Sequence, residues 1–170
     1  MNINQFVYQN QLQPADAIVL KKKFMGMVDH YAIYLGTDDF GTPEFVANFT
    51  KGVKIIPEIE INKQLESYIP NRIERFEGNR NERNEAVSRA LSRIGEKAYN
   101  YIANNCEHFK NWVHHGELTS KQVDNAGNVA AIGGTAMVVG GLLTSNKKTR
   151  NWGTGILALG FLLKSFAERK

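Results

Sequence analysis

The chain has 170 residues, a formal net charge of +4 and a single cysteine. This length suits one domain with a short appendage, and one cysteine excludes an intramolecular disulfide framework and favours a reducing compartment. The basic residues are interleaved with glutamates, as in 72–77, which argues against a nucleic-acid partner and favours attraction to an anionic membrane surface. Residues 1–13 show no basic segment before an apolar core, so we expect no signal peptide.

The first part of the chain predicts an antiparallel meander of strands. Apolar or alternating runs bounded by turn residues predict strands at 15–20, 30–35, 44–49 and 53–56. Lys21-Lys22-Lys23 is expected to form a basic loop after the first strand. In the second strand, the alternation puts His30, Ala32 and Tyr34 on one face.

Two helices are expected after these strands. Residues 79–97 carry apolar side chains at helical spacing and charges on the other face, which predicts a surface helix that covers the sheet. A second amphipathic helix is expected to begin near Asn104 or Asn105, which are both good N-cap residues, and to end at Gly116. Cys106 would then lie in its first turn.

A lone cysteine at a helix start, with a histidine on a separate strand, is typical of a thiol nucleophile and its base. The thiolate is the reactive form, and both a helix N-terminus and an imidazolium at His30 would stabilise it. The unpaired amides of a first helical turn can also hold an oxyanion, so we assign part of that role to the backbone amide of Cys106. The alternative is that Cys106 is a small buried apolar residue and His30 a locally satisfied strand residue.

The other histidines do not predict a catalytic or metal site. His108 is two positions from Cys106, so on a helix its side chain points about 200° away and we interpret it as structural. His114 and His115 are adjacent rather than four apart, and Cys106 with His108 also lacks the spacing of zinc ligands. We predict neither a metal nor a cofactor.

Three sequence words carry a family resemblance. They are His-x-Ala-x-Tyr beginning at His30, Asn-Cys-Glu-His-Phe at 105–109, and 13–18, which is similar to a Pro-Gly-Asp-Leu-Ile strand. With these words the chain resembles the lecithin:retinol acyltransferase-like family and its H-rev-type phospholipase and acyltransferase branch, up to about Gly116. The resemblance implies an α+β fold, namely a circularly permuted NlpC-type, papain-like antiparallel sheet packed with helices.

The resemblance also implies site residues. Cys106 would be the nucleophile that forms an acyl-thioester, and His30 the general base. In animal members the third residue is a histidine in a Val-x-His word, and Val46-Ala47-Asn48 stands at what looks like that place. Asn48 would orient His30, because an amide carbonyl can accept from an imidazole N–H. The 37–44 hairpin looks longer than in those members, which leaves the register open by a residue or two, and Asn48 could instead serve a turn.

The C-terminal part predicts an apolar tail. Residues 125–146 are 22 residues without a charge, enough to cross a hydrocarbon core of about 30 Å. Ala126, Ala130 and Gly134 recur every four residues and would form a ridge for close helix packing. A basic link at 144–150 precedes a shorter apolar segment at 152–163, which suits a membrane interface or pairing with the first helix.

The tail leaves its topology open between a hairpin and a single span. A full crossing would put Lys147, Lys148 and Arg150 on the far side from a cytoplasmic catalytic domain, against the positive-inside tendency, whereas a shallow re-entrant hairpin avoids this conflict. The alternative is a soluble glycine-rich helical pair packed on the domain or on a second copy.

We therefore expect a catalytic domain at 1–118 and a membrane-anchoring helical tail at 119–170. The expected function is thiol-dependent hydrolysis or transfer of phospholipid acyl groups, with an acceptor that the sequence does not specify. The expected partners are a phospholipid membrane and, through the tail, a second copy of the chain, with the catalytic domain in the cytoplasm. A cysteine amidase or peptidase of NlpC type, and a non-enzymatic membrane interaction module, are the alternatives.

Overall fold

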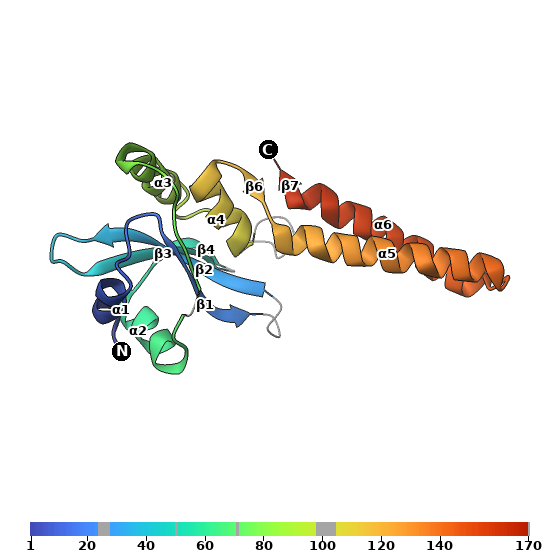
Figure 1. The fold of residues 1–170 in the computed structure, drawn as a ribbon, viewed down its shortest axis with the longest axis horizontal. Helices are drawn as coiled ribbons and strands as arrows, with labels where there is room; N and C mark the ends of the chain where they lie inside the picture. The colour runs from blue at the N-terminus through green and yellow to red at the C-terminus, as the bar shows by residue number, and fades with distance from the viewer. Residues whose placement is uncertain (24–27, 50, 71, 98–104, 170) are drawn as a thin grey trace. The chain divides into compact units, whose positions relative to one another are not determined.

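The computed structural model describes residues 1–170 apart from 24–27, 50, 71, 98–104 and 170. It forms two compact units, Met1–Glu117 and Leu118–Lys170. The first unit is α+β, with an antiparallel sheet between helices, and the second is a pair of long helices (Figure 1).

The sheet of the first unit has five antiparallel strands in the order β4-β3-β2-β1-β5. These are β1 Ala17–Lys23, β2 Val28–Thr37, β3 Pro43–Phe49, β4 Gly52–Ile56 and β5 Ile73–Glu74. The predicted antiparallel meander is confirmed for β1 to β4. Lys21-Lys22-Lys23 continue β1 rather than forming a loop, because the pairing with β2 resumes at Lys23 after an irregularity.

Strand alternation builds two apolar layers on opposite faces of the sheet. Val19, Ile33 and Val46 pack with helices α3 (Arg80–Ser92) and α4 (Cys106–His115). Leu20, Ala32, Tyr34, Phe45 and Ala47 pack on the other side with α1 (Ile3–Gln9) and α2 (Glu58–Ser67). Figure 1 shows the two helix pairs on either side of the sheet. The sheet is thus buried on both faces, which explains why its strands read as largely apolar runs.

The observed helices differ from the predicted ones in two respects. Helix α3 ends at Ser92 rather than at Lys97, because the turn that follows bonds to β4 through Gly95 N–H to Val53 O and Val53 N–H to Glu96 O. Helices α1 and α2 were not predicted. A signal for α1 is present, since Asn2 and Gln5 form a capping box.

The second unit is a helical hairpin. Helices α5 (Lys121–Leu143) and α6 (Lys147–Ala167) run antiparallel, and the short strands β6 (Leu118–Thr119) and β7 (Glu168–Arg169) pair at its base. Helix α6 begins at Lys147, inside the stretch that was expected to be a link. The C-terminal apolar segment is therefore longer as a helix than its apolar residues alone suggested.

Glycines spaced seven residues apart hold the hairpin together. A Cβ on Gly134 would lie 2.4 Å from Leu157 N, one on Gly141 would lie 2.5 Å from Arg150 N, and one on Gly160 would lie 2.5 Å from Ala131 N. The backbones therefore approach too closely for any larger residue. The predicted ridge of Ala126, Ala130 and Gly134 is wrong in part, because Ala126 is exposed and Gly127 takes the contact position.

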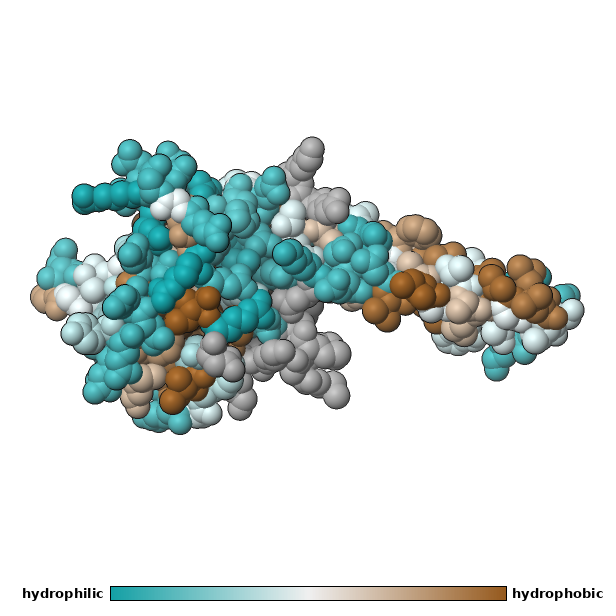
Figure 2. All heavy atoms as spheres, viewed as in Figure 1, coloured by the Kyte–Doolittle hydropathy of each residue, from teal (hydrophilic) through white to brown (hydrophobic). Residues whose placement is uncertain are grey.

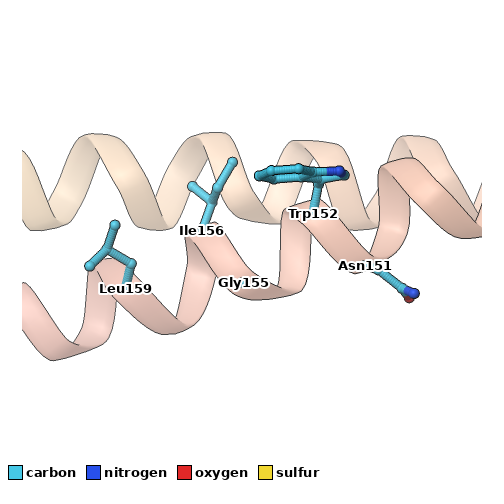
Figure 3. Close-up of a pocket in the computed structure, with 5 residues that line it drawn as sticks. All are labelled: Asn151, Trp152, Gly155, Ile156 and Leu159. Carbon is cyan, nitrogen blue, oxygen red and sulfur yellow. The ribbon is translucent and has the colours of Figure 1, made fainter.

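The outer surface of the hairpin is apolar. Its exposed large side chains are Val129, Ile132, Val139, Leu142, Leu143, Trp152, Leu159, Phe161 and Leu162. Brown, hydrophobic residues gather over both helices in Figure 2. Figure 3 shows Trp152, Ile156 and Leu159 beside Gly155, and these α6 residues line a shallow groove. Among the described helices, one segment, Val123–Leu143, is long and apolar enough to cross a membrane. The tail therefore favours membrane association.

Alanine substitutions at the adjacent Gly133 and Gly134 should act in opposite directions. Gly134→Ala should lower the melting temperature of the hairpin, because the new Cβ would overlap the α6 backbone. Gly133→Ala meets nothing within 4 Å and should raise it, since alanine favours a helix by about 1 kcal/mol over glycine. Thermal unfolding of the full chain in detergent, followed by circular dichroism, measures both. Equal shifts would contradict this packing.

Candidate active site

The only cysteine and the predicted histidine base lie in contact. The Sγ atom of Cys106, the first residue of α4, is 2.9 Å from Nδ1 of His30 in β2, although the residues are 76 positions apart. Both are buried, with 2% and 1% of their surfaces exposed. The structure thus brings together the thiol and the imidazole that the sequence singled out.

A capping box fixes where α4 begins. The Asn105 side-chain oxygen accepts from the amides of Glu107 (2.9 Å) and His108 (3.1 Å), and the Asn105 amide donates to His108 Nδ1 (3.4 Å). Cys106 is therefore held at the first helical position, and His108 has the structural role that was predicted. The other predicted N-cap, Asn104, lies outside the described residues.

Asn48 also reaches the thiol, through its backbone. The Cys106 thiol donates to the Asn48 carbonyl oxygen at 3.0 Å, and Asn48 is buried near the end of β3. The structure therefore places all three predicted residues at one point. This contact is made by the main chain of Asn48, a feature that a residue-type argument does not find.

The site lies at one end of the sheet. By strand alternation, His30 is on the same face of β2 as Ala32 and Tyr34, which pack in the layer with α1 and α2. Cys106 belongs to the apolar layer on the opposite face of the sheet. The His30 ring packs edge-on against Phe49, with 4.9 Å between centroids. Because β2 begins and β3 ends at the same end of the antiparallel pair, the thiol meets residues from both strands there.

The arrangement has the groups that acyl transfer requires. These are a thiol, a basic nitrogen in contact with it, and the first turn of a helix, whose amides and dipole favour negative charge. Among the described residues, no three His, Cys, Asp or Glu side chains gather in a way that could hold a metal ion.

Comparison with protein families assigns the chain to a family. The family model described as lecithin retinol acyltransferase matches residues 10–119, about two thirds of the chain. The chain belongs to the lecithin retinol acyltransferase family. None of the curated proteins matches it. Membership in this acyltransferase family suggests acyltransferase or phospholipase-type activity in lipid metabolism.

In this lecithin retinol acyltransferase family member, residues 13–16 of the word at 13–18 form a tight turn, and residues 17 and 18 begin β1. Ala15, at the place of the glycine in the similar Pro-Gly-Asp word, has φ +72°, a left-handed conformation that favours glycine. Buried Asp16 accepts from the amides of Gln13 and Phe76 and pairs with Arg75 and Arg83. Burial alone would raise the pKa of Asp16, but these bonds outweigh it and lower the pKa.

His114 ties the C-terminal end of α4 to that turn. Its Nε2–H donates to the Ala15 carbonyl at 2.8 Å, and burial lowers the pKa of His114 to about 4. Sequence reasoning excluded His114 as a metal ligand and gave it no other role, because a bond to a distant backbone carbonyl leaves no pattern in the sequence.

Replacing His114 should change how stability depends on pH. Between pH 6.5 and about 4 the unfolded chain binds a proton at His114 that the folded protein does not. The free energy of unfolding should therefore have its full value above pH 6.5 and fall as the pH falls through this window. His114→Gln keeps a donor for Ala15 and should flatten the dependence in urea unfolding at several pH values, whereas exposed His115→Gln should not. An unchanged slope in His114→Gln would refute this assignment.

Proposed function

We propose that this chain is a thiol-dependent acyl hydrolase and acyltransferase that acts on phospholipid esters. The observation that carries the proposal is the 2.9 Å contact between Cys106 Sγ and His30 Nδ1 at the start of a helix. Family membership supports the class of activity, and the apolar hairpin surface supports a lipid as the substrate class.

In the first half-reaction, the thiol S–H turns from the Asn48 carbonyl toward His30 Nδ1 and gives its proton to that nitrogen. The thiolate then attacks the ester carbonyl carbon. A C–S bond forms, and the carbonyl oxygen takes the negative charge. When this intermediate collapses, the C–O bond to the glycerol oxygen breaks and His30 returns the proton to that oxygen. A lysophospholipid leaves, and the acyl group remains on Cys106 as a thioester.

In the second half-reaction, an acceptor attacks the thioester while His30 takes its proton. The C–S bond breaks, and the proton returns to the sulfur, which restores the thiol. Water as the acceptor gives a free fatty acid, so the enzyme is a phospholipase A. A hydroxyl, an amine or a lysolipid as the acceptor gives an acyltransferase.

The oxyanion is assigned to the helix start. The Asn105 side chain occupies the amides of Glu107 and His108, so these two amides serve the cap rather than the substrate. The amide of Cys106 belongs to the residue that attacks and is not one of the two amides that the cap uses, which supports its role in the oxyanion hole.

Asn48 completes the proposed triad by orienting the His30 ring. Its position beside the thiol, through the carbonyl contact at 3.0 Å, supports a role at this point of the site. We also propose a permuted papain-like relationship. Papain-like proteases have the order Cys, His, Asn along the chain, and here the order is His30, Asn48, Cys106, as a circular permutation would produce.

We propose that the α5/α6 hairpin anchors the enzyme at the cytoplasmic face of a membrane. Residues 151–163 of α6, between Arg150 and Lys164, extend only about 20 Å, less than the roughly 30 Å of a hydrocarbon core. This length favours a shallow hairpin over a full crossing. A homodimer through the tail would use its outward apolar face, because the inner glycines already contact α6.

Release of fatty acid and lysolipid from a defined phosphatidylcholine in mixed micelles tests the proposal. Cys106→Ala should abolish turnover, because no nucleophile remains. His30→Gln should lower the rate by about 10²- to 10⁴-fold, the usual contribution of a general base. His115→Gln is the matched control, because His115 is an exposed histidine on α4, the helix that carries Cys106. This variant should keep the wild-type rate.

Full turnover by Cys106→Ala would overturn the proposal. A folded wild-type protein with no turnover would shift the balance to the two alternatives. Hydrolysis of acyl peptides would then indicate a cysteine amidase, and vesicle binding without any hydrolysis would indicate a membrane interaction module.

A further inference from the structure

One guanidinium binds both neighbours of His30. Asp29 and Tyr31 precede and follow His30 in β2. The Nη1 atom of Arg72 lies 2.7 Å from Asp29 Oδ2, and its Nη2 atom donates to the Tyr31 hydroxyl. Arg72 itself is anchored to the sheet, because its carbonyl accepts from the amide of Val19 in β1. The strand segment that carries His30 is thus held on both sides.

The same set of bonds continues to the helix that carries Cys106. The Tyr31 hydroxyl donates to Glu74 Oε1 at 3.1 Å, and Glu74 Oε2 pairs with Lys110 Nζ at 2.7 Å. Lys110 follows Cys106 by four residues, about one turn of α4, so both lie on the same side of the helix. The five residues Asp29, Tyr31, Arg72, Glu74 and Lys110 form what we term the strand–helix network.

The strand–helix network joins buried residues to more exposed ones, since the side chains of Arg72 and Glu74 are 49% and 27% exposed. Tyr31 is 1% exposed and Lys110 8% exposed, and the Lys110 ammonium lies 5.4 Å from the centre of the Tyr31 ring. Burial alone would raise the pKa of Glu74, but hydrogen bonds from Lys110 and Arg72 outweigh it and lower the pKa to about 2. Burial and the Glu74 carboxylate raise the pKa of Tyr31, so its hydroxyl stays a donor. Glu74 and Tyr31 therefore keep the same charge throughout the neutral range.

We propose that Tyr31, Arg72, Glu74 and Lys110 are positioning residues that hold His30 against Cys106. The inference rests on the proposed function. Apolar packing between the sheet and α4 has no preferred direction, whereas these bonds fix the strand segment relative to the helix turn. A shift of about 1 Å between reacting groups can lower a rate 10²-fold. Precise placement of His30 against Cys106 therefore offsets the free energy of desolvating the buried charged groups.

A simple field effect makes the opposite prediction at Glu74. If the network acted only through its charge, Glu74→Gln would remove a negative charge near Cys106, favour the thiolate and speed its reactions. If the network positions the pair, Glu74→Gln breaks the ion pair with Lys110 and slows them. Tyr31→Phe removes the hydroxyl that bonds Arg72 and Glu74 beside His30, and it leaves every charge and the direct Arg72–Glu74 pair in place. Only a positioning role therefore predicts that it slows the thiol.

The pH profile of Cys106 alkylation by iodoacetamide tests this in the full-length protein. Because the chain has one cysteine, the adduct that forms in the wild type and not in Cys106→Ala reports this thiol. Glu74→Gln and Tyr31→Phe should each lower the rate at pH 7 by about 10-fold or more and move the profile toward that of a free thiol. Lys110→Arg, which keeps the cation, should retain most of the reactivity.

Asp124→Asn is the matched control, because it removes one negative charge from the exposed Lys164–Asp124 pair of the second unit and should leave the profile unchanged. Melting temperatures identify any variant that fails to fold. If Glu74→Gln does not fold, Tyr31→Phe still gives the test, because it keeps the buried aromatic ring. Faster alkylation in Glu74→Gln, or an unchanged rate in folded Tyr31→Phe, would overturn the positioning role. A free-thiol profile in the wild type would instead contradict the proposed thiol–imidazole pair.

Discussion

The contact between Cys106 and His30 depends on where one helix begins. The Asn105 cap sets the first turn of α4, and that turn is pressed against the end of the sheet by Phe109 and Val113, which are fully buried. A start one residue later would rotate the thiol by about 100° around the helix axis. The reactive geometry is therefore a consequence of helix capping combined with apolar packing, two ordinary features of folding.

The two units are packed in different ways. In the first, apolar layers cover both faces of the sheet, and buried charges such as Asp16 and Lys110 are paired, as their desolvation requires. In the second, α5 and α6 contact through glycine and leave their large apolar side chains outside. That inversion is typical of helices that pack in lipid, where small residues make the contact.

Much of the fold could be predicted from the sequence because it follows local patterns. Apolar or alternating runs bounded by turn residues located four strands, and a good N-cap type beside the single cysteine located α4. The strand–helix network could not be predicted, since Tyr31 and Glu74 are 43 residues apart and neither stands out by type. The predicted contact ridge of the tail was wrong in part, because it assumed a four-residue spacing, whereas the glycines that contact α6 recur every seven residues.

Trapping the acyl-enzyme tests the central claim most directly. The full-length protein would be quenched in acid shortly after mixing with a defined phosphatidylcholine, and its intact and peptide masses measured. The account predicts an added fatty-acyl mass on the peptide that contains Cys106, removed by neutral hydroxylamine as a thioester should be. An acyl mass on another residue, or fatty acid release with no acyl-enzyme at any time, would contradict it.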